Sequence, residues 1–309
     1  MLKVLIILIP ALFIAFVFAP AAVVTWILCR HREPEDFDRP GARMEPETYG
    51  AFREEMLEDI RWMRGQEHEE VQIRGPDGTA LCGEWYPGGS RAVIFAHGYK
   101  STPLNNFAGI GRWLKENGWS LLMIVERGHG RSGGMCTFGL KEADDIRAWA
   151  EWLDRRDGVD EIVLYGMSMG GAAVNMASPG PWPGSVRGLI ADCGYVDIDA
   201  QMYELMQKMA FNRRMISPFV IFWMQAGFRH RLRGYGTEQL KKAARPMLFI
   251  GGGADSVVSE RTVRHAHEAC GAEKQLLIIE KATHTTAYFT ERTTVQRTVR
   301  EFTDRSEGK

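Results

Sequence analysis

Residues 161–176 have the sequence EIVLYGMSMGGAAVNM. The apolar run Glu161–Tyr165 predicts a buried strand, and the residues after Gly170 predict a helix. Between them lies Gly166-Met167-Ser168-Met169-Gly170. A serine on such a sharp strand-to-helix turn exposes its hydroxyl at the carboxyl edge of a sheet, and the flanking glycines relieve crowding. This stretch therefore predicts Ser168 as a nucleophile.

A second Gly-x-Ser-x-Gly sequence occurs at residues 130–134, GRSGG. It follows Arg127-Gly128-His129, and Gly133, Gly134 and Gly139 break any helical pattern after it. Because the strand and the helix are both missing here, we interpret Ser132 as a loop residue.

Short apolar runs alternate with helical patterns along most of the chain. The alternation predicts a mostly parallel, eight-stranded sheet with helices on both faces. The turn GPDG at residues 75–78 marks a hairpin between the first two strands. The predicted strands are Val71–Arg74, Ala80–Tyr86, Ala92–Ala96, Leu121–Val125, Ile162–Tyr165, Gly188–Ala191, Met247–Ile250 and Leu276–Ile279. The predicted helices are 48–64, 104–117, 140–156, 169–178, 259–270 and 285–303.

A serine nucleophile needs a base, and the base needs a carboxylate that orients it. In sheets of this kind the chain order is serine, acid, histidine. Of the histidines beyond Ser168, His265 and His267 fall in a helical pattern and are interpreted as surface residues. His284 follows the last strand across a short loop, so it is predicted as the base.

Two acids compete for the orienting role. Asp255 follows the strand Met247–Ile250 through a glycine-rich loop, and Asp192 ends the preceding strand. Both reach the edge that carries Ser168. We favour Asp255, because a long insertion begins directly after Asp192 and gives that residue a structural role.

Acyl transfer also needs N–H donors for the oxyanion of the tetrahedral intermediate. The backbone N–H of Met169, directly after the nucleophile, is one candidate. The second is the N–H of Tyr99, in the loop His97-Gly98-Tyr99 that follows the strand Ala92–Ala96. His97 itself is interpreted as shaping this loop.

Together these residues resemble the serine α/β-hydrolase family over about residues 69 to 305. The resemblance implies the α/β-hydrolase fold and a hydrolase that acts through Ser168, Asp255 and His284. Residues 139–145 and the step Asp192–Tyr195 are similar to a bacterial subgroup with an N-terminal membrane anchor, described as serine-aminopeptidase-like. Two positions depart from the family pattern: Val125 replaces a usual Asp, and Ser259 replaces a frequent Pro. The motifs that carry the resemblance are His97-Gly98, Arg127–Ser132, Gly166–Gly170, Gly252-x-x-Asp255-x-x-Val258 and His284.

Residues 4–28 contain no charged side chain. This apolar run is long enough to cross a bilayer, and it is longer than the apolar region of a signal peptide, about 7–15 residues. We expect a single-pass anchor in the cell membrane at 1–28, followed by a juxtamembrane linker with a short helix at 29–65 and the hydrolase domain at 66–309. Basic residues lie on both sides of the run, at Lys3 and at Arg30 and Arg32. They leave the side of the catalytic domain open.

A long insertion separates Asp192 from Pro246 and is rich in Met and Phe. We expect residues 196–240 to form a helical cap over Ser168, with apolar faces that include Met206 and Phe222 and select the acyl group. The alternative is that residues 218–228 pack on the body or rest on the membrane surface.

The composition limits the function. A net charge of -1 argues against nucleic acid as a partner. The five scattered cysteines predict free thiols rather than disulfides or a zinc site, and no cofactor or metal is expected. The sequence therefore predicts a membrane-anchored serine hydrolase of an apolar acyl ester. The alternatives are an amidase or aminopeptidase, in which Glu204 would hold an amine, and a non-catalytic binding protein.

Overall fold

Eight strands form one sheet, in the order β1-β2-β4-β3-β5-β6-β7-β8. The computed structural model describes residues 10–42, 44–207 and 211–305. Strand β1 pairs with β2, and β2 with β4, in antiparallel fashion, and all other neighbours are parallel. The strands are β1 (Glu69–Arg74), β2 (Ala80–Tyr86), β3 (Arg91–Ala96), β4 (Ser120–Ile124), β5 (Glu161–Met167), β6 (Val186–Asp192), β7 (Met247–Gly252) and β8 (Lys274–Ile279). The predicted mostly parallel sheet and its hairpin are confirmed.

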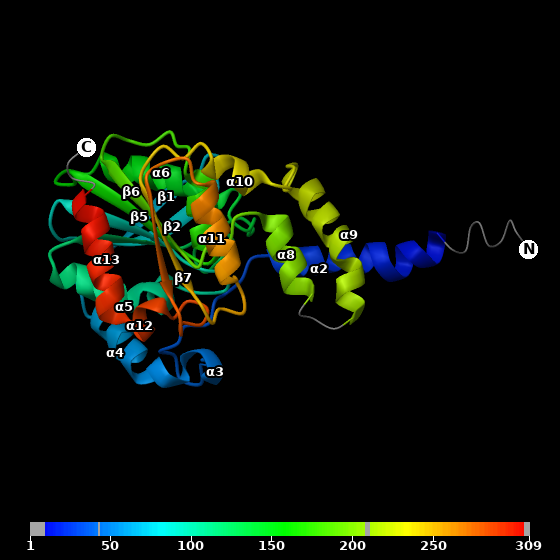
Figure 1. Ribbon diagram of the computed structural model, residues 1–309, viewed down its shortest axis with the longest axis horizontal. Coiled ribbons are helices and arrows are strands. Elements are labelled where there is room, and N and C mark those ends of the chain that lie inside the picture. The colour runs from blue at the N-terminus through cyan, green and yellow to red at the C-terminus, as the bar shows by residue number, and fades with distance from the viewer. Residues whose placement is uncertain (1–9, 43, 208–210, 306–309) are drawn as a thin grey trace, which may run out of the picture.

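Helices cover both faces of the sheet because the central strands are apolar on both sides. One face packs against α6 (Glu142–Asp154), α7 (Met169–Ala177), α10 (Tyr235–Leu240) and α11 (Glu260–Ala269). The other packs against α4 (Arg53–Arg64), α5 (Pro103–Glu116), α12 (Ala287–Thr290) and α13 (Arg292–Arg305). Figure 1 shows these two layers around the sheet.

The segment expected as a linker is partly integrated into the domain. Its helical part has three pieces: α3 (Pro46–Tyr49), the 3-10 turn Gly50–Phe52 and α4. Ile60 and Met63 of α4 are fully buried in the core that α5 shares. The pattern at 285–303 is likewise two helices, α12 and α13.

The insertion after β6 is helical, with α8 (Ile198–Gln207), α9 (Phe211–Phe228) and α10. The N-terminal helix consists of residues 10–29 and includes a π-helical stretch, Ile14–Phe18, before α2 (Ala19–Cys29). Helices α2, α8 and α9 stand out together to one side of the sheet, with α9 running across α2 (Figure 1). The first part of the predicted anchor, residues 4–9, lies outside the described residues.

Candidate active site

Ser168 occupies the tight turn between β5 and α7. Its φ is 54° and its ψ is -112°, a strained backbone conformation that points the side chain away from the turn. The turn is possible because the residues two positions away on either side, Gly166 and Gly170, lack side chains: a Cβ on Gly170 would lie 1.9 Å from the carbonyl oxygen of Ala96. The N–H of Ser168 donates to the carbonyl of Asp192 at 2.8 Å, which ties the turn to the end of β6.

The structure brings Ser168, His284 and Asp255 into one hydrogen-bonded row. Ser168 Oγ lies 2.8 Å from His284 Nε2, and His284 Nδ1 lies 2.7 Å from Asp255 Oδ2. The three residues follow β5, β8 and β7, whose carboxyl ends meet at one edge of the sheet. This geometry suits a serine whose proton passes to a histidine held by a carboxylate.

Asp255 is held rigidly beneath the histidine. Its side chain is completely buried, whereas that of His284 is 17% exposed. Its second oxygen, Oδ1, accepts hydrogen bonds from the N–H groups of Val257 at 2.7 Å and Val258 at 2.9 Å. Two backbone donors and the imidazole thus fix the orientation of the carboxylate.

Asp192, the competing acid, makes a different contact. The hydroxyl of Tyr165 donates to Asp192 Oδ2 at 3.0 Å. Burial raises the pKa of Asp192 to about 6. Its main-chain carbonyl, rather than its side chain, supports the turn at Ser168.

The loop after β3 runs beside the nucleophile. A Cβ placed on Gly98 would meet the Cβ of Ser168 at 3.3 Å, so this backbone lies within reach of a group bound there. The N–H groups of Tyr99 and Met169 donate to no other residue within the described ranges. Met169 begins α7, where the helix leaves its first N–H groups free. These two donors are available for an oxyanion.

Two buried histidines shape this loop without touching Ser168. His97 Nδ1 lies 2.8 Å from the carbonyl of Gly98, and its Nε2 accepts from the N–H of Glu126. His129 Nε2 accepts from the N–H of Lys100 at 3.0 Å. Burial lowers the pKa of His97 to about 3 and that of His129 to about 4. Both are therefore neutral hydrogen-bonding residues at pH 7.

The remaining polar residues singled out in the sequence lie elsewhere. Ser132 is fully buried, and its hydroxyl donates to the carbonyl of Val125 at 2.6 Å and accepts from the N–H of Cys82 at 2.9 Å. His265 and His267 belong to α11, as expected. Glu204 lines a pocket between α8 and α11 whose lining includes neither Ser168 nor His284.

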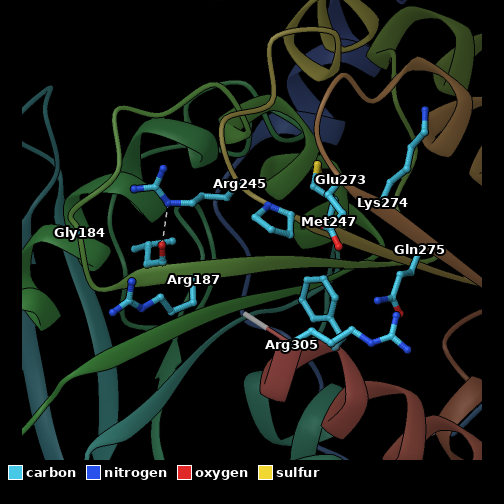
Figure 2. A pocket seen from close by; sticks show the side chains of 11 residues that line it. Gly184, Arg187, Arg245, Met247, Glu273, Lys274, Gln275 and Arg305 are labelled. Carbon is cyan, nitrogen blue, oxygen red and sulfur yellow. Dashed lines mark hydrogen bonds between the residues drawn. The ribbon is translucent and has the colours of Figure 1, made fainter. Parts of the chain in front are cut away.

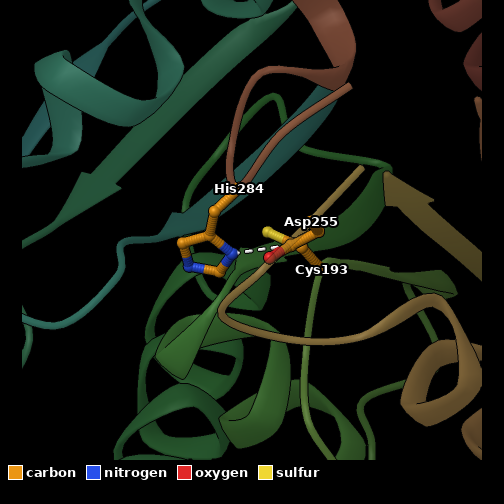
Figure 3. A group of neighbouring side chains, drawn as sticks. All are labelled: Cys193, Asp255 and His284. Carbon is orange, nitrogen blue, oxygen red and sulfur yellow. Dashed lines mark hydrogen bonds and ion pairs between the residues drawn. The ribbon is translucent and has the colours of Figure 1, made fainter. Parts of the chain in front are cut away.

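Cys193 is a neighbour of the site that the sequence reasoning missed. Its thiol lies beside Asp255 and His284 (Figure 3), and the potential ligand atoms of the three residues are within 4.8 Å of one another. These residue types can hold a metal ion, but His284 Nδ1 is already directed at Asp255. The position of Cys193 directly after Asp192, at the end of β6, was the available signal. The described cysteines are all free, in agreement with the sequence.

The N-terminal segment also reaches the site. The hydroxyl of Tyr99 donates to the carbonyl of Leu28 at 2.7 Å, and Arg32 Nε donates to the same hydroxyl at 3.2 Å. Tyr49 Oη lies 2.8 Å from Thr285 Oγ1, next to His284. Segments before β1 thus contact both the loop after β3 and the loop after β8.

A separate pocket lies at the opposite edge of the sheet (Figure 2). It has a volume of about 300 Å³ and lies at the amino ends of β6, β7 and β8, with Val186, Met247 and Lys274 in its lining. Because Ser168 follows the carboxyl end of β5, this pocket is remote from the candidate site.

Comparisons with known proteins agree with this fold. The family model for serine aminopeptidase, S33 matches residues 89–233. An esterase of Pyrococcus furiosus, Pf2001, has a similar structure, with a TM-score of 0.66, 22% identity, and coverage of 89% of this chain and 99% of the esterase. Est1E of Butyrivibrio proteoclasticus, solved with ferulic acid bound, has a TM-score of 0.60 and 20% identity, covering 77% of this chain and all of that one (100%). These likenesses show that the chain has the α/β-hydrolase fold.

Over residues 89–233, less than half of its length, the chain is similar to the S33 serine aminopeptidase family. The chain is 26% identical over 216 residues to an uncharacterised protein of Bacillus subtilis (strain 168), YqkD. The matched region covers 69% of this chain and 70% of YqkD.

Proposed function

We propose that this α/β hydrolase is a membrane-anchored serine hydrolase that cleaves an ester or related acyl bond through an acyl-enzyme. The observation that carries the proposal is the unbroken row from Ser168 Oγ to His284 Nε2 at 2.8 Å and from His284 Nδ1 to Asp255 Oδ2 at 2.7 Å.

In the proposed reaction, Ser168 Oγ attacks the acyl carbonyl while His284 Nε2 takes its proton. Asp255 holds the imidazole in the tautomer with the proton on Nδ1 and stabilises the imidazolium that forms. The N–H groups of Met169 and Tyr99 bind the oxyanion. His284 then passes the proton to the leaving group, which departs. A water molecule next attacks the acyl-enzyme while His284 takes its proton; the bond from the acyl carbon to Ser168 Oγ breaks, His284 returns the proton to Oγ, and the carboxylic acid is released.

The position of Glu204 favours an esterase over an aminopeptidase. An aminopeptidase needs a carboxylate that holds the substrate's amine beside the nucleophile. Glu204 lines the pocket between α8 and α11, away from Ser168. The name of the matched family model, serine aminopeptidase, keeps amide hydrolysis as the second candidate.

Anchoring is proposed from the N-terminal helix. The helix Pro10–Cys29 has a mean hydropathy of 2.5 and only 17% of its most apolar window is buried in the protein. A soluble core helix of this hydropathy would be mostly covered. The exposed apolar surface supports a single-pass anchor in the cell membrane and an apolar acyl substrate that partitions there.

The test begins with a fluorophosphonate probe applied to the full-length protein and to Ser168→Ala. Labelling of the parent only is expected, and equal labelling of both would exclude Ser168 as the nucleophile. A series of p-nitrophenyl esters and aminoacyl anilides then separates the two candidates: turnover of the anilides alone would favour the peptidase.

A further inference from the structure

The cap helix α9 is fastened to the N-terminal helix. Trp223 Nε1 donates to the carbonyl of Phe18 at 3.1 Å, and Thr25 Oγ1 donates to the carbonyl of Val220 at 3.3 Å. The ring of Phe18 also packs against that of Trp223, with centroids 4.9 Å apart. Wherever the N-terminal helix lies, α9 therefore lies beside it.

Both helices carry exposed apolar side chains. On α9, Met215 is 60% exposed and Phe222 is 50% exposed. On the N-terminal helix, Phe16 is 72% exposed and Trp26 is 60% exposed. Phe222 packs against Phe18, so the exposed apolar part of α9 adjoins the N-terminal helix. The expected role of Phe222 in an acyl pocket is not supported by these contacts, because its ring faces the N-terminal helix.

Helix α9 contacts the N-terminal helix at Phe18, which lies within the apolar run 4–28 rather than beyond its end. Phe18 is ten residues before Leu28, the last residue of that run. At the helical rise this separation is about 15 Å, half the thickness of a bilayer's hydrocarbon core. If the run enters a membrane, α9 must reach at least the level of the lipid headgroups.

Charge flanks the apolar part of α9 on both sides. Arg213 and Arg214 precede Met215 in the sequence. Arg229, Arg231 and Arg233 follow Phe228 and are exposed. An apolar helix face with arginines at its ends suits the boundary between acyl chains and anionic headgroups.

We propose that α9 is a second membrane contact: it lies in the surface of an anionic bilayer, with Met215 and Phe222 among the acyl chains and Arg229, Arg231 and Arg233 at the headgroups. The inference rests on the proposed anchor and extends it. The cap is then held at the lipid surface, and acyl substrates reach the hydrolase from the bilayer.

The test measures depth with spin labels in the full-length chain. A Cys82→Ser background is used, because the other four cysteines are buried. Labels at Phe222→Cys, Phe16→Cys and Arg297→Cys are compared in vesicles of phosphatidylcholine with and without phosphatidylglycerol. Arg297 is exposed on α13, at the far side of the body from α2 (Figure 1), so it is the aqueous control.

The expected result is that oxygen reaches the label at 222 better than a water-soluble nickel complex does, as at a site among the acyl chains. The label at 16 should lie deeper and that at 297 in water. A label at 16 in lipid together with a label at 222 as exposed to nickel as that at 297 overturns the inference while the anchor stands. Labels at 16 and 222 both in water overturn the anchor as well.

A charge variant tests the arginines. Phosphatidylglycerol should deepen the label at 222 in the parent but not in the combined Arg229→Ser, Arg231→Ser, Arg233→Ser variant. An equal response in both contradicts the headgroup contact.

Discussion

The hydroxyl of Tyr99, a residue of the loop after β3, donates a 2.7 Å hydrogen bond to the carbonyl of Leu28 at the end of the N-terminal helix. Arg32 donates to the same hydroxyl. The residue whose backbone N–H is proposed to bind the oxyanion is thus held by the segment proposed as the anchor. Tyr99 therefore connects the two proposed parts of the molecule: its backbone belongs to the active site, and its hydroxyl contacts the anchor.

Tyr99→Phe should therefore lower kcat by up to about tenfold and leave KM nearly unchanged. It keeps the N–H donor and the ring contact with Phe138 but releases the loop, and small displacements of catalytic donors are costly. Steady-state kinetics on a soluble ester would measure the effect. Unchanged kcat would show that the loop keeps its position without the hydroxyl.

Ser168→Ala should abolish hydrolysis without a change in the free energy of unfolding. Ser132→Ala should keep most of the activity but destabilise the protein by about 1–3 kcal/mol, because a buried donor and acceptor lose their partner. Kinetics and denaturant unfolding of both variants check this. An inactive Ser132→Ala beside an active Ser168→Ala would reverse the assignment.

Asp255→Asn should reduce kcat by about 10⁴, since the amide would favour the wrong imidazole tautomer. Asp192→Asn serves as the matched control: it perturbs the contact with Tyr165 and should change the melting temperature more than kcat. Equal losses of kcat in the two variants, with unchanged melting, would leave neither acid preferred.

Gly98→Ala should lower kcat by about ten- to a hundredfold, because the new methyl group would press on the Cβ of Ser168 at 3.3 Å. Gly184→Ala is the control, since a Cβ there meets no atom within 4 Å. The two substitutions should have similar melting temperatures. If both have parental kcat, the loop does not approach the nucleophile as closely as described.

Acid should destabilise the protein through His129. Its native pKa is lowered to about 4 by burial, so the unfolded chain binds the proton first and stability falls as the pH drops from about 6.5 towards 4. Between pH 7.5 and 5 this group alone should cost about 2 kcal/mol. The raised pKa of Asp192, about 6, acts in the opposite direction, so the comparison must be made with His129→Gln.

The His129→Gln variant should lose about 2 kcal/mol less than the parent over that interval, as measured by denaturant unfolding at the two pH values. A parallel loss in both proteins would mean that His129 is already protonated, or solvated, in the native state.

Local sequence patterns were sufficient for the sheet and for the row of candidate residues. All eight strands lie within a few residues of their predicted ranges, because most are short apolar runs bounded by turns and β1 is marked by the hairpin turn that follows it. The parallel arrangement then brings the segments after β5, β7 and β8 to one edge. This is why Ser168, Asp255 and His284, far apart in the chain, could be selected together.

The contacts made by the N-terminal segment could not be predicted in this way. Tyr49 and Thr285 are separated by 236 residues, and neither stands in a motif. The pairing of α9 with the N-terminal helix depends on which apolar faces the cap leaves uncovered. Periodicity shows that a helix has an apolar face, but not whether the sheet, a lipid or another helix covers it.

The hydrogen bond between Thr25 and Val220 links residues 195 positions apart. Because the N-terminal helix is synthesised first, this contact forms only after α9 has been made. At translation rates of about 5–20 residues per second, Val220 leaves the ribosome about 10–40 s after Thr25. During that interval the small-residue face of the N-terminal helix, formed by Ala21, Thr25 and Cys29, has no cap helix to cover it. The proposed anchor can therefore enter the bilayer before α9 has been made, and α9 then packs onto a helix that is already in place.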